Sequence, residues 1–282
     1  MGGQAWLFSV LVAVMLEVVS GVEVCKVADL RLVTQTGEFF LAVTFLGMGV
    51  TTVIFVLMAL KASHEKRKFY FTCCYIGMIA TFAYYAMLSG QGWIITPSCR
   101  QMFYVRYVEW IASTPLLLML LAWIVGADIA LTIAVMGAQL LMIFGGYMAA
   151  ISSGHIKWLW FGMALLIFGP IIYIIMSVFK GMVERSDASV AELYNKLSWL
   201  TVVTWACYPF VFLCSEGTGD WSPNFEIMIF GVLDLMSKSV FGFILLLSHQ
   251  ALDRIANLPR FASIGGGDYG TQMADSQRNS KG

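Results

Sequence analysis

Two oppositely charged side chains, four residues apart, interrupt an apolar run near the end of the sequence. Asp234 and Lys238 lie inside the run 227–248, and their spacing places them on one face of a helix. Charges deep in a bilayer are costly unless they are paired or face a polar cavity. A buried lysine can also act as a nucleophile that forms a Schiff base with a carbonyl compound. These two residues alone therefore fit a structural ion pair and an active lysine equally well.

The composition indicates a membrane protein. Of 282 residues, 59% are hydrophobic and only 12% are charged, whereas soluble domains usually carry about 25% charged residues. The net charge of zero gives no sign of a nucleic-acid partner, and no Cys/His spacing suggests a metal site. We expect a lipid bilayer as the surroundings, in the plasma membrane or an endomembrane. No pair of nucleophile and base stands apart from the buried charges, so the sequence does not indicate an enzyme.

Seven apolar runs are long enough to cross a bilayer. A membrane-spanning helix needs about 20 apolar residues, and the backbone must be helical there to satisfy its own hydrogen bonds. We predict an all-α membrane protein with a seven-transmembrane helix bundle. The runs cover residues 39–60, 69–89, 102–125, 129–150, 158–179, 197–215 and 227–248.

The segments outside these runs suggest four parts. Residues 1–22 resemble a cleavable signal peptide, although they lack Lys and Arg. An uncleaved amphipathic segment is the alternative. Residues 23–37 read as an extracellular lead, and residues 38–252 as the seven-helix domain. Residues 253–282 are rich in Gly, Ser, Asp and Gln and are predicted to be a disordered cytoplasmic tail.

The basic residues of the loops predict an orientation. Cytoplasmic loops carry an excess of Lys and Arg, so the N-terminus is expected outside and the C-terminus in the cytoplasm. Arg100 and Lys157 fall in the opposite, outer loops. The basic residues assigned to the cytoplasmic side are Lys61, Lys66, Arg67, Lys68, Lys180, Arg185, Lys196, Arg254 and Arg260.

Two cysteines lie on the predicted outer side, which is an oxidising environment. Cys25 and Cys99 could form a disulfide there. Two unpaired thiols fit the sequence equally well, because the sequence does not supply the distance between them.

The charges left inside the predicted helices sum to zero, as a buried polar cluster requires. Glu216 and Glu226 stand at the outer ends of their helices, so a polar path from the lysine to the outside is predicted. On the other side of the lysine, about three turns beyond Glu109 in the third predicted helix, residues 116–121 are wholly apolar. The four inner residues are Arg106, Glu109, Asp234 and Lys238.

Aromatic residues surround the middle of the predicted bundle. For any one of them ordinary packing is a sufficient explanation, but around a buried lysine they suggest a slot for a flat, conjugated, apolar ligand. They include Tyr84, Tyr85, Trp110, Trp158, Trp160, Trp205, Tyr208 and Phe212.

At these residues the sequence resembles the microbial (type I) rhodopsins, in particular the bacteriorhodopsin-like ones. The resemblance covers about residues 35–252 in consistent order. It rests on Arg106-Tyr-Val-Glu-Trp-Ile-Ala-Ser-Thr-Pro-Leu-Leu-Leu118, Trp205-Ala-Cys-Tyr-Pro209, Ser215-Glu-Gly217 with Glu226, and Leu233-Asp-Leu-Met-Ser-Lys238.

The resemblance implies a chromophore and roles for the residues around it. Lys238 is expected to bind all-trans-retinal as a protonated Schiff base, with Glu109 and Asp234 as its counterions and Arg106 ordering water nearby. Light would then pass the proton to Glu109. The side chains expected to enclose the chromophore are Tyr84, Trp110, Thr114, Met142, Trp205 and Tyr208.

Two departures from the family pattern bear on function. The proton acceptor of bacteriorhodopsin-like pumps is usually Asp, but here it is Glu109, and the inner proton donor is replaced by Leu120. Outward proton transport with a slow photocycle is our main hypothesis, with protons or other small ions as the cargo. A photosensory receptor with an unidentified transducer is the first alternative, and a light-gated ion channel is the second. The family also commonly forms dimers or trimers.

Overall fold

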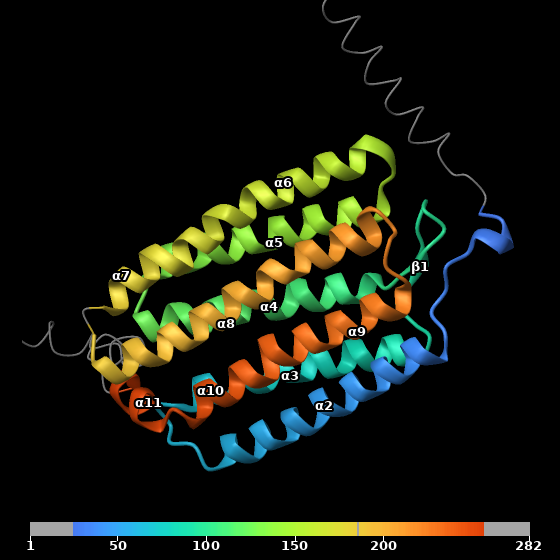
Figure 1. Ribbon diagram of the computed structural model, residues 1–282. Helices are drawn as coiled ribbons and strands as arrows, with labels where there is room; N and C mark the ends of the chain where they lie inside the picture. The colour runs from blue at the N-terminus through green and yellow to red at the C-terminus, as the bar shows by residue number, and fades with distance from the viewer. Residues whose placement is uncertain (1–24, 185, 257–282) are drawn as a thin grey trace, which may run out of the picture.

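The structure is a computed structural model that describes residues 25–184 and 186–256 of the chain. Long helices run side by side as one bundle, and a short β-hairpin lies at one end (Figure 1). The first half contains η1 (Val27–Asp29), α2 (Gln35–Leu60), α3 (Arg67–Leu88), β1 (Ile94–Ile95), β2 (Gln101–Met102), α4 (Tyr104–Val125) and α5 (Ile129–Ile151). The second half contains α6 (Gly154–Tyr173), η2 (Ile174–Phe179), α7 (Lys180–Val183), α8 (Ala188–Phe212), η3 (Leu213–Gly217), α9 (Pro223–Asp234), η4 (Leu235–Val240), α10 (Phe241–Leu247) and α11 (His249–Ala256).

The prediction of seven membrane-spanning helices is confirmed. Within the described residues, seven continuous helical segments are long and apolar enough to cross a bilayer, with mean hydropathies from 1.5 to 2.3. Large apolar side chains such as Phe82 and Leu166 point away from the bundle and are more than 70% exposed. Such a surface is stable against lipid tails but not against water.

The bundle has two distinct ends, which we name by what they carry. The hairpin end holds the antiparallel β1–β2 pair, and the α11 end holds the short terminal helix (Figure 1). Helices that follow one another in the sequence pack together, and α9 returns to contact α2, which closes the bundle. The basic loop after α2 and the loop before α8 both lie at the α11 end.

Short-range signals fix where several helices begin and end. The Asp128 side chain accepts a hydrogen bond from the Leu131 backbone N–H and caps the start of α5. Ser222 caps α9 in the same way, with Pro223 at the first helical position. Gly126 ends α4 with a φ of 67°, a left-handed conformation that glycine adopts without strain.

The α8 helix begins well before the predicted start of its apolar run. It starts at Ala188 rather than at residue 197, because its first turns bury Val190, Leu193 and Tyr194 on one face. The Tyr194 hydroxyl also donates a 2.7 Å hydrogen bond to the Ile175 carbonyl in η2. A search for apolar runs alone misses this extension, because its exposed face is polar.

The terminal segments differ in part from the prediction. The prediction of disorder is wrong for residues 253–256, which belong to α11 because Leu252 and Ile255 are buried against the bundle. Asp253 also forms a salt bridge with Lys66. Helix α2 begins at Gln35, so residues 35–37 of the expected lead are helical. The predicted signal peptide and the rest of the predicted tail lie outside the described residues.

A disulfide fastens the N-terminal segment to the hairpin end. Cys25 and Cys99 are bonded, with 5.6 Å between their Cα atoms, across 74 positions of sequence. The Arg31 backbone N–H donates to the Cys99 carbonyl at 2.9 Å, which holds the two segments together beside the bond. Of the two alternatives that the sequence left open, the structure has the disulfide.

Breaking this disulfide should lower stability. A bond that closes a long loop restricts the unfolded chain, and its loss typically costs about 2–4 kcal/mol. We expect Cys99→Ser to lower the thermal unfolding midpoint in detergent, as an added reductant should for the unmodified protein. Cys214→Ser is the matched control, since Cys214 is a free cysteine. Equal midpoints for the two variants would contradict the prediction.

Candidate functional site

Lys238 and its two acids meet in the middle of the bundle. Lys238 lies in η4, a π-helical turn, which is a distortion often found at functional sites. Its ammonium pairs with Asp234, four residues earlier, and lies 3.3 Å from the Glu109 carboxylate of α4. All three side chains are at most 4% exposed. The structure therefore brings together the three charges that the sequence placed at the centre.

The two acids around Lys238 have different surroundings. Asp234 accepts hydrogen bonds from Tyr84 at 2.6 Å and Tyr208 at 2.7 Å, and a longer one from Trp110 at 3.4 Å. The oxygens of Glu109 accept no hydrogen bond from the described residues. Ionised carboxylates are stabilised by such donors, so the negative charge is held firmly on Asp234 and less firmly on Glu109.

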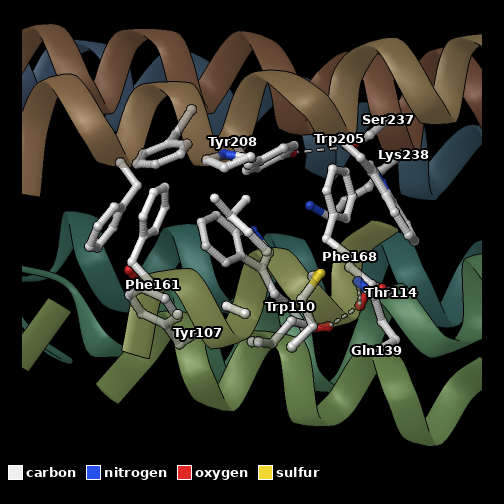
Figure 2. Close-up of a pocket in the computed structure, with 18 residues that line it drawn as sticks. Tyr107, Trp110, Thr114, Gln139, Phe161, Phe168, Trp205, Tyr208, Ser237 and Lys238 are labelled. Atoms are coloured by element: carbon white, nitrogen blue, oxygen red, sulfur yellow. Dashed lines mark hydrogen bonds between the residues drawn. The ribbon is translucent and has the colours of Figure 1, made fainter. Parts of the chain in front are cut away.

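A cavity lined by 18 of the described residues reaches the Lys238 side chain. Its walls come from α4, α5, α6, α8, α9 and η4, and most are aromatic or aliphatic. Trp110 and Tyr208 both line it and meet edge-on, with 5.0 Å between their ring centres, and Figure 2 shows Trp205 beside Lys238. Five of the predicted ligand-binding residues line the cavity together with Lys238: Trp110, Thr114, Met142, Trp205 and Tyr208.

Tyr84 has a different place from the other predicted pocket residues. It is fully buried and is not one of the side chains that line the cavity. Its hydroxyl instead donates to Asp234 Oδ2, on the opposite oxygen from the Tyr208 hydroxyl. Tyr84 therefore acts on the site through Asp234.

The predicted outer acids are buried at the hairpin end, each with its own partners. Glu226 forms salt bridges with Arg106, at 3.1 Å, and with Arg100. Glu216 Oε2 accepts a 2.7 Å hydrogen bond from the Tyr107 hydroxyl. Arg106 lies one turn of α4 nearer the hairpin end than Glu109 and is anchored to Glu226.

Buried charge is absent from the other half of the described bundle. The buried Asp, Glu, Lys and Arg residues of the described chain all lie at Lys238 or towards the hairpin end. Towards α11, Leu117, Leu120 and Leu121 pack into an apolar cluster with Phe241 and Leu245. The polar path is therefore one-sided.

Comparison with known proteins decides the family. A model of the family described as "Bacteriorhodopsin-like protein" matches residues 35–252, which is most of the chain. The chain belongs to the microbial rhodopsins. It is 31% identical to Opsin-1 of Neurospora crassa over 82% of this chain and 83% of that protein. It is also 31% identical to Sensory rhodopsin-2 of Natronomonas pharaonis, over 76% of this chain and 87% of that one.

A solved structure supports the same assignment. The light-driven proton pump rhodopsin of Coccomyxa subellipsoidea superposes with a TM-score of 0.75 at 28% identity, over 78% of this chain and all of that chain. This rhodopsin is therefore a multi-pass integral membrane protein. Its relatives include proteins named as a light-driven proton pump and as a sensory rhodopsin, and members of its family are pumps or sensors rather than enzymes.

Sequence reasoning missed two cations of this rhodopsin. Arg100 and Lys157 were assigned to outer loops, but they are only 2% and 7% exposed. Lys157 donates a 2.6 Å hydrogen bond to the Glu216 carbonyl. A count of the charges on the predicted polar path could have indicated that further cations are buried there. The predicted polar path holds only two bases, Arg106 and Lys238, against four acids, and a buried cluster favours neutrality.

Proposed function

We propose that this rhodopsin binds all-trans-retinal covalently at Lys238 and, under light, moves a proton from Lys238 to Glu109 and outwards, with slow recovery. The observation that carries the proposal is the one-sided arrangement around Lys238. Two acids lie beside its ammonium, a chain of buried charges leads to the hairpin end, and no buried acid lies towards α11 in the described chain.

The cavity fits an extended polyene chromophore. Retinal is long, flat and apolar except at its aldehyde, and the cavity is walled mainly by aromatic and aliphatic side chains, with Lys238 as its only charged lining residue among those described. When bound, retinal supplies the absorption of visible light and the change of shape that follows. Trp110, Trp205 and Tyr208 would hold its chain, and Lys238 Nζ would form the covalent link.

Glu109 is the better proton acceptor of the two acids. A proton on Asp234 would displace hydrogen bonds that Tyr84 and Tyr208 already donate to its oxygens. A proton on Glu109 would displace none from the described residues. The uneven surroundings therefore favour transfer from Lys238 Nζ to Glu109 Oε2, 3.3 Å away.

The direction of transport follows from the orientation of the chain. Basic residues such as Lys61, Arg67 and Lys180 belong to loops and helix ends on the α11 side, which supports placing that side in the cytoplasm. The hairpin end, with its disulfide, would then face the outside. A proton that leaves Lys238 through the charged half of the bundle would move out of the cell or organelle.

Recovery should be slow and should depend on pH. Because Leu120 offers no proton and is fully buried, Lys238 must regain its proton from bulk water through an apolar region. We expect a long-lived deprotonated state whose decay slows as pH rises, as measured by flash spectroscopy across the visible range. Recovery in milliseconds at a rate independent of pH would contradict this.

An acid introduced at Leu120 tests the same point. We expect Leu120→Asp to accelerate recovery by about 10²-fold at neutral pH, because a positioned proton donor typically contributes that much or more. It should also weaken the dependence on pH. Leu120→Asn is the control, since it has the same size and polarity without a proton to give. An equal acceleration in both variants would show that hydration, rather than a donor, causes it.

A sensory function is the second candidate. The apolar α11 half would prolong the deprotonated state, which suits a signalling state, and one relative is named as a sensory rhodopsin. Light-evoked current under voltage clamp, at several ion gradients, separates the candidates. A current of one sign at all voltages supports the pump, whereas a current that reverses at an ion's Nernst potential indicates a channel. Absence of current in a coloured, cycling protein supports a sensor that acts through a transducer.

A further inference from the structure

Two buried tyrosines lie in the apolar cluster around Leu120, and the proposed proton route uses neither of them. Tyr194 belongs to α8 and is fully buried, and Tyr70 belongs to α3 and is 5% exposed. A buried phenol needs a partner for its hydroxyl, because an unpaired polar group in apolar surroundings is costly. The partners of these two hydroxyls therefore show which parts of the α11 half are tied together.

Each hydroxyl reaches a backbone carbonyl on a different element. The Tyr194 hydroxyl donates a 2.7 Å hydrogen bond to the Ile175 carbonyl in η2. The Tyr70 hydroxyl donates a longer one, of 3.3 Å, to the Leu246 carbonyl in α10. Other buried hydroxyls of this half, such as that of Thr201, bond a carbonyl of their own helix. The two tyrosines instead join α8 to η2 and α3 to α10.

The Tyr194 hydrogen bond is made where the accepting helix is distorted. Pro170 lies inside α6, and the π-helical turn η2 follows at Ile174. Proline removes a hydrogen bond of the helical ladder, and such interruptions let a helix bend. The start of α8 lies beside α7, which continues directly from η2 (Figure 1). The Tyr194 hydroxyl therefore ties α8 to a segment whose own ladder resists bending poorly.

Both hydrogen bonds involve helices that also carry residues of the cavity. Trp205 lies about three turns after Tyr194 in α8, a distance of about 16 Å along the axis. Leu246 lies about two turns after Lys238, a distance of about 12 Å. A movement of Trp205 or Lys238 during the reaction is therefore passed to a segment that one of the two hydroxyls holds.

Water cannot enter the α11 half unless these hydrogen bonds break. To reach Lys238 from this end, water must separate the side chains around Leu120. While a phenol stays buried, breaking its bond leaves an unpaired hydroxyl that only the arriving water can satisfy, so the bond favours the closed arrangement. In the described chain no buried charge lies in this half, and the charged groups near Tyr70 are Lys66 and Asp253, which pair with each other.

We propose that Tyr194 is a positioning residue that keeps the α11 half closed, with Tyr70 as a second and weaker one. By excluding water, the two hydroxyls set how long Lys238 remains without its proton. The first of these statements concerns the fold alone, whereas the second rests on the proposed function. The phenols do not carry the proton, since each donates to a backbone carbonyl and not to an acid or a base.

Two buried cysteines of the same cluster report its opening without any photochemistry. Cys73 and Cys74 are free and at most 5% exposed. Full-length protein is treated with iodoacetamide before retinal is added, and mass spectrometry follows alkylation at each cysteine. We expect Tyr194→Phe to raise both rates about fivefold, the effect of removing one hydrogen bond from the closed arrangement. Tyr70→Phe should raise them less, because its bond is longer.

Tyr173→Phe is the matched control for these variants. Tyr173, the last residue of α6, is 64% exposed, so its loss of a hydroxyl should leave alkylation unchanged. Cys207 and Cys214, which are also free and lie further along α8 and in η3, serve as an internal reference. An equal increase at all four cysteines would indicate a general loss of stability. That result, or unchanged rates at Cys73 and Cys74 in Tyr194→Phe, would overturn the proposal.

Flash spectroscopy of the retinal-bound protein tests the second statement. We expect the deprotonated state of Tyr194→Phe to decay about fivefold faster at every pH. The slope of the decay rate against pH should stay the same, because bulk water still supplies the proton, whereas Leu120→Asp should flatten it. Tyr173→Phe should decay like the unmodified protein.

Three other outcomes of the flash experiment would count against the second statement. Slower decay in Tyr194→Phe would mean that the phenol relays the proton, and unchanged decay would mean that it does not limit the entry of water. If no deprotonated state forms in the unmodified protein, the proposed function and the second statement fail together. The alkylation rates still decide the first statement in that case.

Discussion

Replacing Lys238 with alanine should give a protein that never becomes coloured when retinal is added. Lys238 is the only amine that lines the cavity in the described chain, and a covalent imine needs that amine. We therefore expect complete loss of the visible absorption band, with free retinal remaining at its own absorption. Absorption spectra after purification and removal of unbound retinal measure the result.

The matched control for this variant is Lys157→Ala. Lys157 is also a buried lysine, but its amine binds the Glu216 carbonyl and does not line the cavity. It should keep the visible band. Lys238→Ala leaves Asp234 with its hydrogen bonds from Tyr84 and Tyr208, so the fold should persist, as size-exclusion chromatography and circular dichroism can verify. A visible band in a folded Lys238→Ala protein would remove the basis of the proposed function.

Glu109→Gln should shift the visible band to the red and stop the first proton transfer. The Glu109 carboxylate lies 3.3 Å from Lys238 Nζ, so its charge stabilises the positive nitrogen in the dark. Without that charge the positive charge spreads further along the polyene, which lowers the excitation energy. The variant also lacks the proton acceptor. Static spectra and flash spectroscopy measure the two effects on one sample.

Two comparisons sharpen this result. Glu109→Asp keeps a carboxylate and should keep transfer, at a changed rate. Asp234→Asn should disturb the site more widely, because Asp234 holds Tyr84, Trp110 and Tyr208 as well as Lys238. An unchanged spectrum in Glu109→Gln would count against Glu109 as a counterion and would leave Asp234 as the only counterion of Lys238.

The centre of the site could be predicted because burial makes charges conspicuous. Within apolar runs, Glu109, Asp234 and Lys238 had few alternative partners, and helical spacing placed each on an inward face. The structure then added what spacing cannot give, namely the hydrogen-bond donors. Tyr84 and Tyr208 both reach Asp234 from other helices, and no sequence pattern states which acid they choose.

The hairpin end was harder to predict because its residues stand between apolar runs. Arg100 belongs to the turn before β2, where an exposed loop is the ordinary expectation. Its guanidinium is buried against Glu226, which α9 brings to the same place, and also donates to the Trp221 carbonyl. The start of α8 was missed for a related reason. Its first turns pack against neighbouring helices along one face, while the other face carries Glu192 and Lys196, paired with each other and exposed.

The early start of α8 gives this helix a mechanical property. The continuous segment Ala188–Gly217 has 30 residues, a length of about 45 Å, whereas the hydrocarbon core is about 30 Å thick. The helix that carries Trp205 and Tyr208 beside the cavity is therefore long enough to extend beyond the lipid. Any tilt of α8 that begins at the cavity is enlarged at Glu192 and Lys196, where a spin label or a soluble partner would meet it.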